Sequence, residues 1–253
     1  MLDYASIQAF ANRARTEIDH LDYAILNAGV MQNSFARSSY GWENSLQVNL
    51  LSTTLLALHL LPKLKANTLP GFTPVLELIG SGTHFLANTH PEADDPSQDP
   101  LQFYNTPKNF RGMGGQYAIS KLFLMYAYAH LSKMGISTKN GKLAVYVQVV
   151  CPGYTQSGLG SGDASGPLRL VGNAMKATVA RSTEKGARTY IAGLTLGEKG
   201  HGRFWQYDRI QPAAPLLVDD KAMERQERVW GAVLTALRKD VPGVDRLVDE
   251  ASR

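Results

Sequence analysis

Cysteine is nearly absent from this chain of 253 residues, which contains only Cys151. One thiol cannot form a disulfide within the chain, so a fold stapled by disulfides is excluded. A lone cysteine in a chain of this length is typical of a reducing compartment. We therefore expect a cytoplasmic protein in which Cys151 is a small core residue at the end of an apolar strand.

Long apolar runs and blocks of one charge are also missing. The most apolar stretch, residues 50–64, is interrupted by hydroxyl side chains, His59 and Pro62, whereas a membrane-spanning helix needs roughly 20 apolar residues. The net charge of +4 comes from 26 Lys and Arg against 22 Asp and Glu spread along the chain. We expect no membrane span, no targeting leader and no nucleic-acid partner.

Metal-ligand patterns are lacking as well. His84, His90 and His201 have neither the spacing of metal ligands nor a neighbouring acid that would complete a catalytic triad. Histidines of this kind are usually structural. We therefore predict no metal site.

Three short apolar runs, each followed by small residues, are the clearest elements present. They are 22–26 before Asn27-Ala28-Gly29, 75–79 before Gly80-Ser81-Gly82, and 143–150 before Cys151-Pro152-Gly153. Helical patterns occur at 6–18, 42–65 and 117–134, and a short strand at 203–207 and a helix at 219–238 follow. This alternation predicts an α/β fold with a doubly wound, Rossmann-like parallel sheet, in one domain spanning 1–253.

Two segments interrupt this alternation. Residues 87–113 are rich in Pro, Asp, Asn and Gly and predict a long loop over the site, and the glycine-rich residues 158–166 predict a mobile lid. Long loops in a compact domain are usually functional or disordered. Since ligands of such sheets bind beyond the carboxyl ends of the strands, we expect the site near Asn27, Ser81 and Pro152-Gly153.

A tyrosine and a lysine lie one helical turn apart in Gln116-Tyr117-Ala118-Ile119-Ser120-Lys121. A free phenol has a pKa of about 10 and is a weak base near neutrality, so a nearby cation is needed to favour the phenolate. Lys121 is on the same helix face and is expected to supply that charge. The spacing alone has little specificity, and an amphipathic surface pair is the structural alternative.

Further motifs make the pattern more specific than the tyrosine–lysine spacing alone. They are Leu2-Asp3, Asn27-Ala28-Gly29, Asn49, Ile79-Gly80-Ser81, Tyr117 with Lys121, and the run from Cys151 to Ser157. In this order they resemble the short-chain dehydrogenase/reductase family, of the retinol-dehydrogenase-like and fungal tailoring-enzyme type. The resemblance covers most of the chain and places Leu2-Asp3 at the end of that family's third strand.

The resemblance implies an oxidoreductase that interconverts an alcohol and a carbonyl on a small lipophilic, secondary-metabolite-like substrate with NADP(H). Tyr117 would be the general acid or base and Lys121 its cation, while Ser81 would polarise the substrate oxygen and Asn49 would hold a relay water. A turn serine at Ser81 and a satisfied helix amide at Asn49 are the structural alternatives. The residues implied to bind the cofactor are Asp3, Asn27, Ala28, Gly29, Tyr117, Lys121, Pro152, Gly153 and Thr155.

The chain departs from this family at its start, because no glycine precedes Gly29. The family begins with a glycine-rich turn that lets backbone amides approach the pyrophosphate. We therefore expect an N-terminally truncated sheet whose strand at 22–26 is an exposed apolar edge, through which two copies could form a homo-oligomer. The separation of Ser81 and Tyr117 is also wide, because residues 87–113 are inserted between them.

Two other functions remain open at this stage. Without a pyrophosphate site, Tyr117, Lys121 and Ser81 could act as an acid/base and oxyanion set in a cofactor-independent isomerase, dehydratase or cyclase. A non-catalytic remnant is the third reading, and it predicts that Tyr117→Phe has no phenotype.

Overall fold

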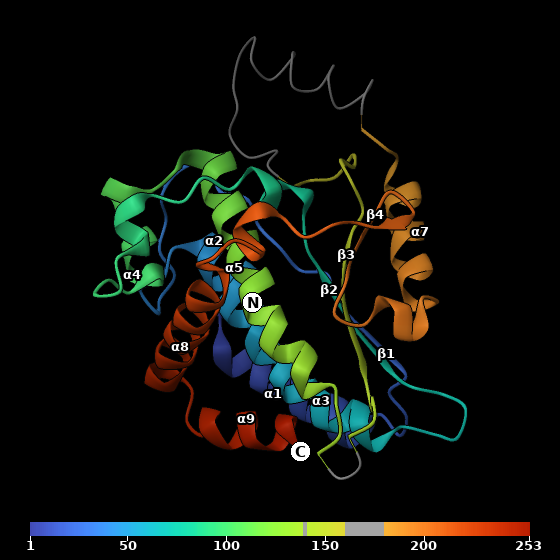
Figure 1. The fold of residues 1–253 in the computed structure, drawn as a ribbon. Helices are drawn as coiled ribbons and strands as arrows, with labels where there is room; N and C mark the ends of the chain where they lie inside the picture. The colour runs from blue at the N-terminus through green and yellow to red at the C-terminus, as the bar shows by residue number, and fades with distance from the viewer. Residues whose placement is uncertain (139–140, 160–179) are drawn as a thin grey trace.

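Five strands form one sheet in the computed structural model, which describes residues 1–138, 141–159 and 180–253 (Figure 1). The strands lie in the order β1 (Tyr23–Leu26), β2 (Val75–Ile79), β3 (Tyr146–Cys151), β4 (Phe204–Gln206) and β5 (Arg209–Ile210). The first four are parallel and β5 is antiparallel to β4. The predicted α/β, Rossmann-like sheet is thus confirmed, with one short antiparallel strand at its edge.

The apolar runs become strands because both faces of the sheet are covered there. All five residues of β2 are buried, which is the pattern of a central parallel strand. Its register places Leu78 opposite Leu26 on one side and opposite Val149 on the other. The carboxyl ends of β1, β2 and β3 therefore reach the same edge.

A tight hairpin joins β4 and β5. Tyr207 and Asp208 both have positive φ, 54° and 56°, the conformation of a two-residue turn that matches the twist of the flanking strands. The strand predicted at 203–207 is therefore one member of a hairpin.

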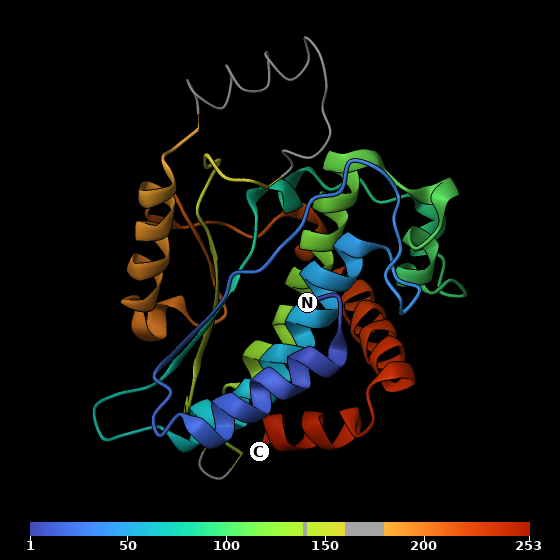
Figure 2. The same cartoon turned by 180° about the vertical axis from the view of Figure 1, so that it is seen from behind.

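The helices cover the two faces of the sheet unequally, as Figures 1 and 2 show. On one face α3 and α5 pack against the strands, with α1, α8 and α9 packed against these two helices, and α7 packs on the other face. Their bounds are α1 Tyr4–Glu17, α2 Asn44–Leu46, α3 Thr53–Ala66, α4 Pro100–Tyr104, α5 Gly112–Met134, α7 Thr183–Leu194, α8 Ala222–Asp240 and α9 Val244–Ser252.

The helix predicted at 42–65 is divided into α2, a π-helical segment at Gln47–Ser52 and α3. A π turn accommodates one extra residue and is frequent at functional sites. The whole stretch Asn44–Ala66 is long and apolar enough to cross a membrane by length and composition, but it is mostly buried inside the protein. It packs as a buried helix in the core.

The first residues differ from the sequence prediction. Residues 1–3 form no strand, and Asp3 is the N-cap of α1, where its Oδ1 accepts a hydrogen bond from the Ala5 amide at 3.0 Å. The same oxygen accepts a bond from the Tyr40 hydroxyl at 3.1 Å. Interpreting Leu2-Asp3 as a strand end is therefore wrong here, because an aspartate that precedes a helical run satisfies free backbone donors.

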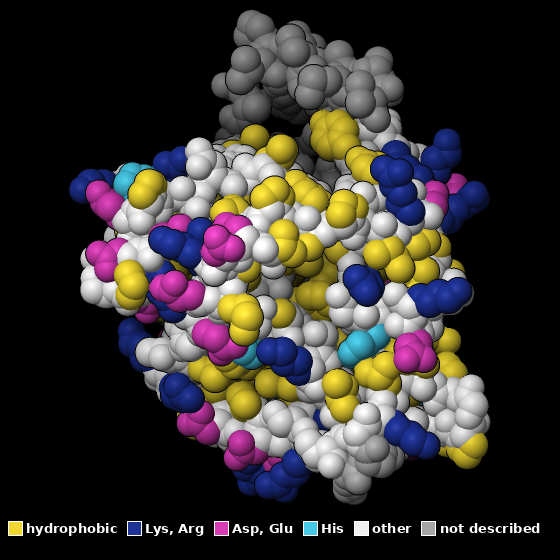
Figure 3. All heavy atoms as spheres, in the orientation of Figure 1, with side chains coloured by type: hydrophobic (Ala, Val, Ile, Leu, Met, Phe, Trp, Pro, Cys, Tyr) yellow, Lys and Arg dark blue, Asp and Glu magenta, His cyan; other side chains and the backbone are white. Residues whose placement is uncertain are grey.

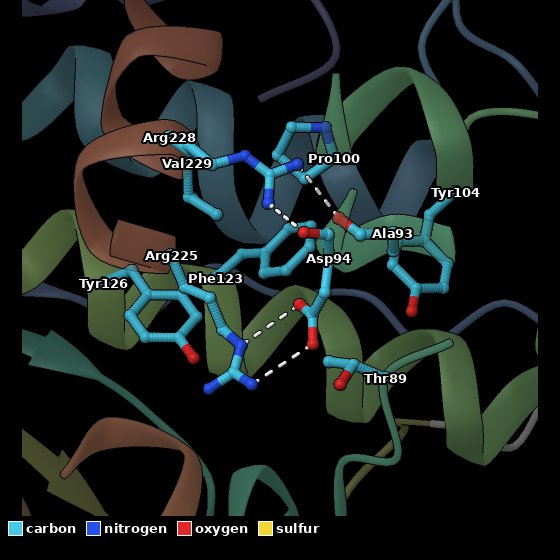
Figure 4. Close-up of a pocket in the computed structure, with 10 residues that line it drawn as sticks. All are labelled: Thr89, Ala93, Asp94, Pro100, Tyr104, Phe123, Tyr126, Arg225, Arg228 and Val229. Carbon is cyan, nitrogen blue, oxygen red and sulfur yellow. Dashed lines mark hydrogen bonds and ion pairs between the residues drawn. The ribbon is translucent and has the colours of Figure 1, made fainter. Parts of the chain in front are cut away.

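The inserted segment 87–113 is more ordered than the predicted loop, since it contains α4 and short 3-10 turns. Arg225 of α8 bonds the Asp94 carboxylate at 3.0 Å, and Arg228 donates to the backbone carbonyls of Ala93, Asp94, Asp95 and Gln98. Figure 4 shows these side chains around a small pocket between α8 and the insertion. The predicted lid at 158–166 lies outside the described residues from residue 160 onward.

Candidate active site

The ends of three parallel strands bring the sequence-predicted residues together. Asn27 follows β1, Ser81 follows β2 and Pro152 follows β3. The Gly82 amide donates to the Cys151 sulfur at 3.3 Å, which joins the loop after β2 to the end of β3. This edge is the position at which doubly wound sheets bind ligands.

Ser81 is placed by the turn that it caps. It has extended backbone angles, φ −152° and ψ 139°, and a 3-10 turn, Gly82–Leu86, begins directly after it. Its Oγ accepts bonds from the Thr83 amide at 3.2 Å and from the Thr83 hydroxyl at 3.0 Å. The capping geometry of a turn serine is therefore present.

Tyr117 lies near the start of α5 and is 7% exposed. Burial raises the pKa of Tyr117 to about 12, and the nearby Ser81 side chain opposes this rise. At neutral pH the phenol is therefore protonated, which is the form that donates a proton.

Lys121 is buried one turn further along α5. Its Nζ donates to the Ile79 carbonyl at 2.7 Å and lies 5.7 Å from the centre of the Tyr117 ring. Burial lowers the pKa of Lys121 to about 8. The expected fall of the Tyr117 pKa is not found, because desolvation of the phenol is the larger effect.

Asn49 is fully buried in the π-helical segment, and its amide is already engaged. Its Oδ1 accepts from the Val30 amide at 2.9 Å, and its Nδ2 donates to the Val30 carbonyl at 2.8 Å and to the Ser120 hydroxyl at 2.9 Å. Ser120 in turn donates to the Tyr117 carbonyl. These contacts match the satisfied-amide alternative, although Asn49 ties the loop after β1 to the helix of Tyr117.

The loop after β1 approaches Lys121 closely. A Cβ added to Gly29 would lie 3.2 Å from the Asn49 Oδ1 and 3.8 Å from the Lys121 Nζ. The Asn27 Oδ1 accepts a bond from the Tyr190 hydroxyl of α7 at 3.0 Å. Asn27 and Ala28 are exposed, so this loop forms one open wall of the site.

The loop after β3 forms the opposite wall. Gly153 has φ +77°, a conformation that disfavours other residues, and its amide donates to the Cys151 sulfur at 3.4 Å. Thr155 donates to the carbonyls of Pro152 and Gly153. Cys151 is 4% exposed, as predicted, but its sulfur also accepts from Gln206, so it joins the loops that carry the site.

Exposed apolar side chains occur at the same edge of the sheet as these polar groups. Leu86, Met113 and Tyr154 are 79%, 37% and 45% exposed, and each belongs to a segment at the carboxyl edge of the sheet. Figure 3 shows apolar side chains gathered over this upper part of the molecule. The pocket of Figure 4 is separate and contains none of the four predicted catalytic residues in its lining.

Sequence reasoning missed a buried polar network behind Tyr117. Glu43 and Gln116 are both fully buried, and the Gln116 amide donates to the Glu43 carboxylate at 3.0 Å and to the Tyr104 carbonyl at 3.3 Å. Glu43 also caps α2 through the amides of Ser45 and Leu46. The capping position of Glu43 before an apolar helix was the one local signal that could have revealed it.

Comparison with known proteins identifies the family. No family model matches the chain. The chain is 36% identical over 253 residues to the short-chain dehydrogenase/reductase ffsI of Aspergillus flavipes, over 100% of this chain and 72% of that protein. It is 34% identical over 250 residues to the short-chain dehydrogenase/reductase phmF of Phaeosphaeria nodorum, over 98% and 71% of the two chains.

A solved structure agrees with the fold. The active-site complex of RhlG with NADP from Pseudomonas aeruginosa aligns with a TM-score of 0.54 and 20% identity, over 82% of this chain and 72% of that one. Fold and relatives together show that the chain belongs to the short-chain dehydrogenase/reductase family and is an oxidoreductase.

Proposed function

We propose that this protein interconverts an alcohol and a carbonyl on a small lipophilic substrate with NADP(H). The observation that carries the proposal is the Lys121 ammonium 5.7 Å from the centre of the buried Tyr117 ring, with the Ser81 side chain near enough to lower the pKa of the same phenol. A phenol, a hydroxyl and a cation close together are what proton transfer to a developing alkoxide needs.

In the reducing direction, the substrate oxygen would lie between the hydroxyls of Ser81 and Tyr117. Ser81 would donate a hydrogen bond that polarises the carbonyl, and Tyr117 would transfer its proton to the oxygen as negative charge develops there. A bound nicotinamide supplies or accepts the hydride in such chemistry. Lys121 would stabilise the phenolate that remains on Tyr117.

The residues present fit the nicotinamide end of a dinucleotide. Gly29 leaves open the space beside the Asn49 amide and the Lys121 ammonium that a side chain would fill, and the two loops at the strand ends form opposite walls. RhlG, which shares the fold, was solved with NADP. The residues proposed to hold the cofactor are Asp3, Asn27, Ala28, Gly29, Tyr117, Lys121, Pro152, Gly153 and Thr155.

The lipophilic substrate is supported by the surroundings of the site. Leu86, Met113 and Tyr154 expose apolar surface at the carboxyl edge. Contact with such side chains favours apolar ligands that carry few polar groups. The insertion 87–113, held by α8, would shape one side of this pocket.

Two proposals concern the protein as a whole. The lone, buried Cys151 supports a cytoplasmic location. Tyr23, at the start of edge strand β1, is 46% exposed, which supports a homo-oligomer that pairs these edges. Size-exclusion chromatography with light scattering tests the second proposal, and a monomer at every concentration would contradict it.

The catalytic proposal is tested by replacing Tyr117. Consumption of NADPH is measured with a panel of aryl and alkyl ketones, and Tyr117→Phe is expected to reduce kcat about 10²- to 10⁴-fold, since the phenol is the proton donor. Tyr126→Phe is the matched control on the same helix, because the Tyr126 hydroxyl bonds the Leu216 carbonyl away from the site. Equal activity in Tyr117→Phe and wild type would overturn the proposal.

Cofactor binding is tested separately by thermal shift. Because a ligand at about 100 times its Kd stabilises a protein by about 2.7 kcal/mol, NADPH or NADH should raise Tm measurably. Ketone or alcohol turnover without any nicotinamide would instead favour a cofactor-independent isomerase or dehydratase at the same residues.

A further inference from the structure

Thr83 is not among the residues that the family resemblance assigned, yet it makes two contacts to the Ser81 hydroxyl. Its amide lies 3.2 Å and its Oγ1 lies 3.0 Å from the Ser81 Oγ, and both groups donate. Thr83 belongs to the 3-10 turn that begins after Ser81, so its position is fixed by the same short segment.

The number of hydrogen bonds that a serine hydroxyl can form limits what Ser81 can do beyond these two contacts. A serine hydroxyl has one hydrogen to donate and two lone pairs to accept with. Thr83 fills both lone pairs of Ser81. The only hydrogen of Ser81 is therefore available to a group other than Thr83, and the Tyr117 phenol, whose raised pKa the Ser81 side chain partly offsets, is near enough to be affected by it.

We propose that Thr83 is a positioning residue that makes Ser81 a hydrogen-bond donor toward the reacting oxygen. This inference rests on the proposed function, because it concerns how Ser81 and Tyr117 act on a substrate. Without the Thr83 hydroxyl, Ser81 can rotate its hydrogen away and accept a bond from Tyr117. The substrate oxygen would then lose its fixed donor, and Tyr117 would have its proton engaged in the wrong direction.

The surroundings of Ser81 support this division of roles. The Ser81 carbonyl is 2.7 Å from the His84 Nδ1, so the backbone of the turn is held independently of the Thr83 hydroxyl. The amide of Thr83 would also remain in any substitution of its side chain. Removing the hydroxyl should thus change one hydrogen bond and leave the turn intact.

The experiment compares Thr83→Val, which removes the hydroxyl and keeps the shape, with Thr83→Ser, which restores the hydroxyl. The matched control is Thr68→Val, because the Thr68 hydroxyl also bonds two oxygens, the carbonyls of Lys65 and Ala144, at the opposite end of the sheet. The first readout is the NMR signal of the Tyr117 Cζ in protein with carbon-labelled tyrosine, assigned through its loss in Tyr117→Phe.

The Tyr117 signal is expected to move in Thr83→Val, to return in Thr83→Ser and to stay in place in Thr68→Val. This readout does not require turnover, so it tests the inference even if the proposed alcohol–carbonyl activity is not found. A Tyr117 signal that is unmoved in Thr83→Val, or equally displaced in Thr83→Ser, would overturn the inference.

The second readout is steady-state kinetics with the ketone panel. Thr83→Val is expected to lower kcat about 10- to 100-fold with KM nearly unchanged, since the lost interaction acts on the transition state. Thr83→Ser should recover most of this loss. If wild type reduces the ketones, Tyr117→Phe is inactive and Thr83→Val is fully active, the role of Thr83 is refuted and the proposed function stands. If wild type shows no turnover, the proposed function is refuted.

Discussion

Burial shifts the pKa values of two single residues at the carboxyl edge away from their usual values. Burial raises the pKa of Tyr117 to about 12 and lowers that of Lys121 to about 8. The site therefore holds a neutral phenol, while Lys121 is the group that titrates nearest to physiological pH. A carbonyl reductase with this arrangement needs Lys121 charged, because the phenolate left after proton transfer must be stabilised.

We expect a pH dependence that follows from the lowered pKa of Lys121. Below pH 8 the ammonium is intact and kcat for ketone reduction should be level, whereas above about 8 the charge is lost and kcat should fall up to about tenfold per pH unit. Lys65→Met is the control, because burial also lowers the pKa of Lys65, which bonds the Ala251 carbonyl far from the site. A decline that disappears in Lys65→Met would contradict the assignment to Lys121.

Elements were predictable where one local pattern decides them. Residues 75–79 are β2 as predicted, since a continuous apolar run suits a strand buried on both faces. The strand predicted from residue 143 begins at Tyr146, because Leu143 instead bridges to Ile136. Helix α9 was missed, although Pro242 and Gly243 before it were visible as a break.

The candidate site could be predicted only in part, because some of its contacts join residues that are far apart in the sequence. Tyr117 and Lys121 are one turn apart in sequence, so their proximity is local. Asn49 contacts Val30 and Ser120, which are 19 and 71 residues away, and no sequence spacing encodes such contacts. The effect of burial on the Tyr117 pKa was likewise missed, because desolvation depends on the packing of the whole site.

The contact of α7 with the sheet depends on a glycine. A Cβ added to Gly193 would lie 2.3 Å from the Glu77 Oε2 and 2.7 Å from the Val150 Cγ2, so Gly193→Ala must move α7 away from β2 and β3. We expect a loss of about 1–3 kcal/mol in the free energy of unfolding, measured by urea denaturation.

The same substitution on α8 is the control. Gly231 also lies inside a helix, but a Cβ added there would meet nothing within 4 Å. Gly231→Ala should therefore stabilise the protein by roughly 0.5–1 kcal/mol, since alanine is the better helix former. If both variants changed stability in the same direction, close packing of α7 at Gly193 would not be the cause.

At the scale of the whole molecule, the sheet buries a carboxyl group in its centre. Glu77 of β2 is fully buried, and its Oε2 accepts a bond from the Gln148 Nε2 at 2.8 Å. Among the described residues, the Glu77 Oε1 and the Gln148 Oε1 have no hydrogen-bond partner. Burial accordingly raises the pKa of Glu77 to about 8.

This raised pKa links global stability to pH. The folded protein holds a proton on Glu77 that the unfolded chain releases at lower pH, so the stabilisation is complete below the unfolded pKa of 4.5 and is lost as the pH rises through about 8. Glu77→Gln removes the titrating group and keeps its shape. At about pH 9 the variant should exceed wild type by on the order of 2–4 kcal/mol in free energy of unfolding, and the two should converge near pH 5. Glu224→Gln, at an exposed position of α8, should keep the wild-type pH dependence. If the free energies of unfolding of Glu77→Gln and wild type differed by the same amount at every pH, Glu77 would not be protonated in the fold.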